Sequence, residues 1–186
     1  MRDPLPAAVL SRLSGLSRIF LVGTGTSYHG ALVGQYLMRS AGVEAWAIPA
    51  FEFVNYPPRI KADDGLLLLS HRGTKRFSQA ALEAFDHREH WLAITGDGSP
   101  LHGPGVINTV AQERSPVHTA SHTGAMVRLA QLAVGLGSRL VRHSGHIDHD
   151  LHARARRRQG RRPHRLRDRQ PGADRIPHVR LHQVRL

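Results

Sequence analysis

The sequence predicts an α/β fold, a three-layer sandwich in which a five-stranded parallel sheet lies between helices. Short apolar runs such as residues 19–22 and 66–69 suit strands that are covered on both faces. Segments with helical spacing of apolar residues alternate with these runs. Strands and helices that alternate through short loops imply right-handed crossovers, and therefore a parallel, flavodoxin-like sheet.

The order of elements follows from the same patterns. We expect Gly42 to end the first long helix as a C-terminal cap, and the prolines at 57 and 58 to stop a short helix. The expected elements are a lead-in helix within 1–17, a strand, turn and helix over 18–41, a strand at 43–48, a short helix at 49–56, a strand at 66–70, a helix at 77–87, strands at 90–95 and 106–110, an irregular segment at 111–120, and a long helix from 121 or 122 to 140.

The turn after the first strand is rich in small residues, GTGTS at 23–27. Its glycines allow a sharp turn and a close approach of a ligand to the backbone. Thr26 or Ser27 can cap the helix that follows. The first N–H groups of a helix lack helical partners and carry the positive end of its dipole, so the turn predicts an anion site, most naturally for phosphate.

A dinucleotide-binding site is the alternative interpretation of a strand, glycine turn and helix. That fingerprint needs a third small residue, where this chain has Tyr28, and an acid at the end of the second strand. The second strand has Glu44 near its start and ends on Ile48. These mismatches disfavour a nicotinamide site, and no cofactor is expected.

The positive charge of the chain is concentrated at its C-terminal end. The formal net charge is +12, of which residues 142–186 contribute +9, from thirteen Arg and four Asp. This segment has neither Lys nor Glu, shows no lasting periodicity, and is expected to be a disordered, low-complexity tail. Lys and Glu vanish together, which favours a shifted reading frame in GC-rich DNA. A basic tail that binds nucleic acid and a genuine extension are the alternatives.

Composition also limits the site chemistry and the compartment. The absence of cysteine excludes disulfides, thiolate metal sites and a cysteine nucleophile. The tail histidines lack an ordered scaffold, so no metal site is expected. Without a membrane-length apolar run or a signal peptide, the sequence points to the cytoplasm and to no membrane partner. The expected organisation is a lead-in helix at 1–17, one α/β domain at 18–141 and the tail at 142–186.

Three motifs then suggest a family. VGTGTSYH at 22–29 resembles the G-x-G-T-S-x-H turn of SIS (sugar isomerase) domains, and AFEF at 50–53 resembles their A-x-E-F segment. SHTGA at 121–125, with the QL that follows at 131–132, loosely resembles their S-T-K-A helix start. Over residues 18–140 the chain is most similar to the first SIS domain in the isomerase half of glutamine–fructose-6-phosphate aminotransferase and to its stand-alone relatives.

The resemblance implies binding of a phosphosugar, a carbohydrate derivative, at two loops at the carboxyl ends of strands. Ser70 and Gly73 match the family's S-Q-S-G-E-T phosphate loop, whereas His71, Arg72 and Lys75 depart from it and add two cations. The binding residues that we expect are Gly25, Thr26, Ser27, Ser70, His71, Arg72, Gly73, Lys75 and Ser121, with His29 and Glu52 as further candidates.

Each of these residues also has a structural interpretation. Thr26 and Ser70 could serve only as helix caps, and Arg72 and Lys75 could be solvated loop charges. His29 can pack or hydrogen-bond locally, one turn into its helix. Glu52 is better explained as a structural hydrogen-bond acceptor than as a general base.

The resemblance also limits the expected activity, which is that of a sugar-phosphate isomerase or an isomerising aminotransferase. The glutaminase cysteine is absent, and residues 141–186 have no counterpart of the second SIS domain, which supplies the catalytic glutamate. We therefore expect the first half of a two-SIS-domain protein that binds a phosphosugar without robust turnover. A regulatory phosphosugar sensor and a nucleic-acid-binding protein are the alternatives.

The long helix over 122–140 carries apolar residues around much of its circumference, including Val127 and Val134. A single sheet-facing stripe does not use them all. An exposed apolar face usually marks a contact surface. We therefore expect a homodimer, or pairing with a second SIS domain, through this helix.

Overall fold

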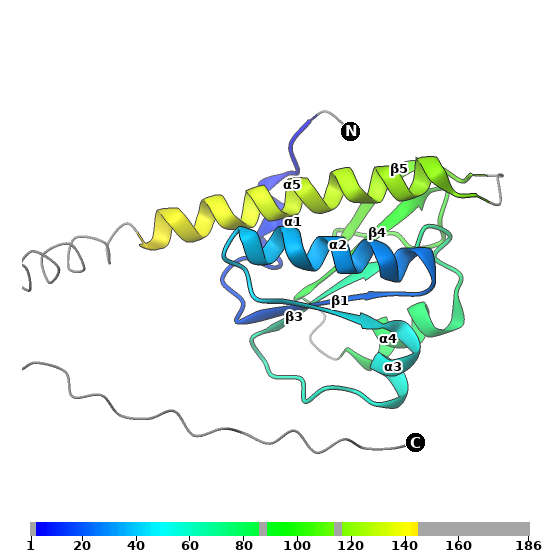
Figure 1. Ribbon diagram of the computed structural model, residues 1–186, viewed down its shortest axis with the longest axis horizontal. Coiled ribbons are helices and arrows are strands. Elements are labelled where there is room, and N and C mark those ends of the chain that lie inside the picture. Colours follow the sequence, from blue (N-terminus) through cyan, green and yellow to red (C-terminus); the bar gives the residue numbers. More distant parts are fainter. Residues whose placement is uncertain (1–2, 86–88, 114–116, 145–186) are drawn as a thin grey trace, which may run out of the picture. The chain divides into compact units, whose positions relative to one another are not determined.

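The computed structural model describes residues 3–85, 89–113 and 117–144, and its core is a parallel sheet (Figure 1). Five strands pair in the order β2-β1-β3-β4-β5, and each pair is parallel. The strands are β1 Arg18–Gly23, β2 Ala45–Pro49, β3 Asp64–Leu69, β4 Trp91–Asp97 and β5 Val106–Ala111. The predicted fold class is therefore confirmed.

Helices cover both faces of the sheet, as Figure 1 shows. One face packs against α1 Ala7–Ser11, α2 Thr26–Ser40 and α5 Thr119–Ser144, and the other against α3 Ala50–Asn55 and α4 Arg76–Ala84. β1 and β3 are buried on both faces, as their uninterrupted apolar sequences require.

The strand order reverses direction between β1 and β3. The chain leaves β1 for β2 on one side, whereas β3, β4 and β5 follow one another on the other side. Gly23 of β1 lies opposite Leu69 of β3, so the loops after both strands leave the sheet together. The carboxyl ends of strands at such a reversal are where open α/β sheets bind ligands.

The start of α2 corrects the predicted helix cap. Gly25, with φ 58°, is the N-cap residue, and neither Thr26 nor Ser27 makes a side-chain capping bond. The N–H groups of Tyr28 and His29 both donate to the Gly25 carbonyl, so the backbone turn itself satisfies them. Thr26 and Ser27 lie inside the helix and not at its N-cap, because the chain turns at Gly25.

The end of α2 agrees with the prediction for Gly42. Gly42 has φ 82°, its N–H donates to the Arg39 carbonyl at 3.0 Å, and Val43 N–H donates to the Met38 carbonyl at 2.9 Å. This pair of bonds is a Schellman motif, which satisfies the last helical carbonyl groups. It sends the chain directly into β2.

The end of α4 and the start of α5 differ from the prediction. The helix α4 ends at Ala84 rather than at 87, because Phe85 leaves the helical conformation and buries its ring in the core. The helix α5 begins at Thr119 rather than at 121, because the Glu113 carboxylate accepts the N–H groups of Ala120 and Ser121 from outside the helix. This remote cap has no local sequence signal.

The entry to β3 is held by an ion pair between the buried Asp64 and the partly exposed Arg18. The Arg18 guanidinium donates to both carboxylate oxygens of Asp64, at 2.7 and 2.8 Å, and Lys61 N–H donates to the same carboxylate at 2.6 Å. Burial, the largest effect, raises the pKa of Asp64, but these hydrogen bonds together outweigh it. The pKa therefore lies below its ordinary value of 3.8.

Within the part of the chain that the structure describes, no helix is both long enough and apolar enough to cross a membrane. The helix α5 runs through Ser144 rather than ending at 140, so it includes the first three residues of the tail predicted at 142–186. The rest of that tail, from 145 onward, lies outside the described residues, so the expectation of disorder there stays a prediction.

Candidate phosphate-binding pocket

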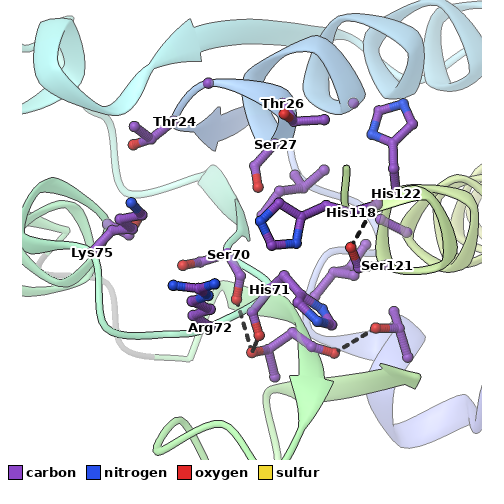
Figure 2. Close-up of a pocket in the computed structure, with 18 residues that line it drawn as sticks. Thr24, Thr26, Ser27, Ser70, His71, Arg72, Lys75, His118, Ser121 and His122 are labelled. Carbon is purple, nitrogen blue, oxygen red and sulfur yellow. Dashed lines mark hydrogen bonds between the residues drawn. The ribbon is translucent and has the colours of Figure 1, made fainter. Parts of the chain in front are cut away.

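A pocket of about 290 Å³ opens at the carboxyl ends of β1 and β3, where the strand order reverses. Its volume is at the small end of the range for small-molecule sites. Three segments line most of it: the β1–α2 turn, the loop from β3 into α4, and the start of α5. Figure 2 shows their polar side chains gathered around one space.

The β1–α2 turn contributes Thr24, Gly25, Thr26 and Ser27 to the pocket. Gly23 below them is tightly enclosed, since a Cβ atom there would lie 2.6 Å from the backbone carbon of Ser27. The turn can therefore approach the sheet only because residue 23 has no side chain. This close approach brings the start of α2 to the rim of the pocket.

The loop after β3 contributes Ser70, His71, Arg72 and Lys75, and α4 adds Ser78. The first helical bond of α4 runs from Gln79 N–H to the Lys75 carbonyl, so the three N–H groups before it have no helical partner. These groups give the helix start a partial positive charge beside two cationic side chains.

Two serine hydroxyls in this pocket are buried and unpaired. Ser70 is 4% exposed and Ser78 is 1% exposed, and neither Oγ atom has a hydrogen-bond partner among the described residues. A buried hydroxyl without a partner costs about 1–3 kcal/mol. Because both residues line the same pocket, a ligand with several acceptor oxygens would supply the missing bonds.

His71 is held in place by its backbone and ring together. Its carbonyl accepts bonds from Gly96 N–H and from Gln112 Nε2, both at 2.8 Å, and its Nε2 accepts the Glu113 N–H at 3.3 Å. Burial lowers the pKa of His71 below its ordinary value of 6.5. The neutral ring must then carry its proton on Nδ1, which is buried without a partner among the described residues.

The third side of the pocket is formed by His118, Ser121 and His122 around the start of α5. His118 has φ 50°, a left-handed conformation, and its Nδ1 atom is buried without a partner in the described part of the chain. The Ser121 hydroxyl already donates to the His118 carbonyl at 2.9 Å. Glu113 faces the α5 backbone, and the Ser121 N–H group holds the pKa of its carboxyl below the ordinary value.

The structure brings most of the predicted site residues to the pocket and leaves three outside its lining. Gly73 is buried in the loop, where its N–H donates to the Ser70 carbonyl at 3.1 Å and shapes the turn. His29 and Glu52 are exposed and do not line the pocket. The predicted residues that do line it are Gly25, Thr26, Ser27, Ser70, His71, Arg72, Lys75 and Ser121.

Sequence reasoning missed Ser78, His118 and His122 as lining residues. Ser78 follows a phosphate-type loop at the start of a helix, and that position was a usable signal. His118 lies between an unpatterned segment and a helix, where no periodicity indicates its direction.

As for metal chemistry, residues 3–85, 89–113 and 117–144 contain no group of three or more His, Cys, Asp or Glu that could hold an ion.

No protein-family model matches the chain. In sequence, the glutamine–fructose-6-phosphate aminotransferase (isomerising) of Bacillus subtilis strain 168 is 30% identical over 135 residues. The match covers 70% of this chain and 22% of that protein. The chain therefore spans far less than the full length of this relative.

Two solved structures share the fold at low sequence identity. The sugar isomerase domain of an RpiR transcription factor from Sphaerobacter thermophilus has a TM-score of 0.58 and 18% identity, over 81% of this chain and 88% of that one. The tagatose-6-phosphate ketose/aldose isomerase of Escherichia coli has a TM-score of 0.53 and 24% identity, over 67% of this chain and 39% of that one.

The sheet order, the helix layers and these similarities confirm the predicted class: the described residues have the fold of a SIS (sugar isomerase) domain. Within that class, the sequence similarity is to glutamine–fructose-6-phosphate aminotransferase, as the motifs at 22–29 and 50–53 indicated.

Proposed function

We propose that this chain binds a phosphosugar in the pocket between the β1–α2 turn and the start of α4. The observation that carries the proposal is the pair of buried, unpartnered hydroxyls of Ser70 and Ser78 beside Arg72 and Lys75. A phosphate group offers acceptor oxygens to the hydroxyls and charge to the cations. The start of α4 adds N–H groups without helical partners to the same place.

The similarity to known proteins supports the same ligand class. The sequence relative is named for fructose 6-phosphate, and one of the structurally similar proteins is named for tagatose 6-phosphate. We propose binding rather than robust turnover, because isomerisation needs a base that moves a proton between neighbouring carbons. Among the described residues that line the pocket, none is a carboxylate.

The test compares fructose 6-phosphate with fructose by titration calorimetry and by thermal unfolding of the full chain. The phosphorylated sugar should bind and raise the melting temperature, since a ligand that binds only the native state stabilises it. Fructose should do neither. The proposal fails if fructose 6-phosphate neither releases heat nor shifts the melting temperature at millimolar concentration, or if fructose binds as well.

A further inference from the structure

Among the residues that the structure describes, those lining the pocket that we assign to a phosphosugar include no acidic side chain. Its described lining contains Ser and Thr hydroxyls, Arg72, Lys75 and three histidines, but neither Asp nor Glu. The nearest candidate, Glu113, is committed elsewhere, because its carboxylate accepts the N–H groups of Ala120 and Ser121. The chemistry of the lining limits which phosphosugar fits. The inference drawn from it rests on the proposed function.

The polar groups of the lining fall at two ends of the pocket. Figure 2 shows Arg72, Lys75 and Ser70 toward one side, and His118, Ser121 and His122 toward the other. The first group, together with Ser78, offers a phosphate hydroxyl donors and positive charge. The second group lies across the pocket, where the remainder of a phosphosugar would extend.

At the end of the pocket formed by His118 and His122, one imidazole nitrogen lacks a partner. Among the described residues, the Nδ1 atom of His118 is buried without any hydrogen bond. A neutral imidazole carries one N–H donor, and a protonated imidazole carries two. When His118 carries its proton on Nδ1, an oxygen atom of the ligand can accept this missing bond, and a negatively charged oxygen makes the stronger bond.

An amino group meets the opposite situation. An ammonium group has three donors and no acceptor, so it needs carboxylate or carbonyl partners. In this pocket an ammonium group would meet the side chains of Arg72 and Lys75, which carry positive charge as it does. Its usual partner, a free carboxylate, is missing from the described lining.

We propose that the preferred ligand is a phosphosugar with a second acidic group, such as a phosphorylated sugar acid, and that phosphorylated amino sugars are disfavoured. The phosphate lies at the Ser70 end, and the second acidic group lies at the end formed by His118 and His122.

Two matched pairs of probes test this proposal by calorimetry on the full chain at one pH and ionic strength. 6-Phosphogluconate and sorbitol 6-phosphate differ only in a carboxylate against a hydroxymethyl group. Glucosamine 6-phosphate and glucose 6-phosphate differ only in an ammonium against a hydroxyl group. We expect 6-phosphogluconate to bind about ten-fold more tightly than sorbitol 6-phosphate, and glucosamine 6-phosphate about ten-fold more weakly than glucose 6-phosphate.

A control is needed because a chain with a net charge of +12 attracts any additional negative charge. The double variant His118→Gln/His122→Gln should reduce the preference for 6-phosphogluconate while it keeps the affinity for sorbitol 6-phosphate. His102→Gln removes an exposed histidine outside the pocket lining and should leave the preference unchanged.

The outcomes separate the two proposals. If none of the four probes binds, the proposed function itself fails. If the members of each pair bind equally well, phosphosugar binding stands and the preference for a second acidic group is overturned. If the preference survives in the His118→Gln/His122→Gln variant, it comes from the overall charge, and the assignment to the histidine end is wrong.

Discussion

Ser70 and Ser78 come from different elements, the end of β3 and the first turn of α4, yet their hydroxyls line one pocket. Polar atoms that are buried without partners in a folded protein call for an explanation. Capping does not provide one, because α4 has no side-chain capping bond and Ser70 precedes the helix by several residues. Binding of an oxyanion does explain the two buried hydroxyls, because a phosphate can accept a hydrogen bond from each of them.

Removing a phosphate-binding hydroxyl should weaken binding without unfolding the protein. Ser70→Ala and Thr26→Ala should each cost about 1–3 kcal/mol of phosphosugar binding, because each deletes a bond to a charged acceptor. Neither hydroxyl makes a hydrogen bond that the fold needs among the described residues. Calorimetry checks the affinities.

Ser40→Ala is the matched control, since that hydroxyl is exposed and donates to the Leu37 carbonyl at the far end of α2. Unchanged affinity in both pocket variants would refute the assignment of these loops.

The ion pair between Arg18 and Asp64 should govern part of the acid sensitivity of the fold. Because the folded pKa of Asp64 is depressed, its contribution is complete above the unfolded value near 3.8. That contribution is lost as the pH falls from there through the folded pKa. Arg18 is 25% exposed, so Asp64→Asn should lower the free energy of unfolding at pH 7 by about 2 kcal/mol, less than for a fully buried pair.

Urea unfolding of wild type and Asp64→Asn at pH 7 and at pH 3 measures this contribution. The difference between the two proteins should narrow at pH 3. Asp97→Asn, at the exposed end of β4, is the control and should change stability by no more than about 0.5 kcal/mol. A difference that stays constant with pH would show that Asp64 is not the titrating group.

At the scale of elements, the β1–α2 turn places the pocket. Its backbone packs so closely that Gly23→Ala should cost about 3 kcal/mol or more, because the new Cβ meets backbone atoms of Ser27 and Tyr28 at 2.6 and 2.7 Å. Gly30→Ala is the matched control, where the added Cβ meets the flexible end of Met126 at 3.0 Å rather than any backbone atom. Thermal unfolding should separate the two variants, and equal losses would mean that the turn adapts more easily than its packing implies.

The same elements show what the sequence could and could not predict. The runs at 19–22 and 66–69 were identifiable as buried strands, because four consecutive apolar residues can all be buried only in a strand that is covered on both faces. The helix cap at Thr26 or Ser27 was predicted wrongly, since the chain already turns at Gly25. His118 was missed because its direction depends on a left-handed backbone and a remote cap from Glu113, neither of which leaves a periodic pattern.

At the scale of the whole molecule, α5 leaves an apolar stripe without cover in the described structure. Val127 is 37% exposed, Val134 is 69% exposed, and Ala130 between them is exposed as well, whereas Leu129 and Leu132 face the core. These positions follow helical spacing on one side of α5. An apolar stripe of this kind usually marks a contact surface.

We therefore predict that the chain forms a symmetric dimer through α5, in which each copy covers the stripe of the other. The double variant Val127→Glu/Val134→Glu should be a folded monomer, because the new charges cannot be buried in the contact. Ala84→Glu, at an exposed position of α4 on the other face of the sheet, should remain a dimer. Sedimentation of the unmodified chain as a monomer at high concentration would contradict this prediction.

The central claim is that the buried serines of this pocket bind the phosphate of a phosphosugar. A crystal structure of the full chain with fructose 6-phosphate tests it most directly. We predict a phosphate oxygen within about 3 Å of Ser70 Oγ and another within the same distance of Ser78 Oγ, with Arg72 or Lys75 beside them. A phosphate that binds outside the pocket, or inside it with both hydroxyls still unpaired, would contradict the claim.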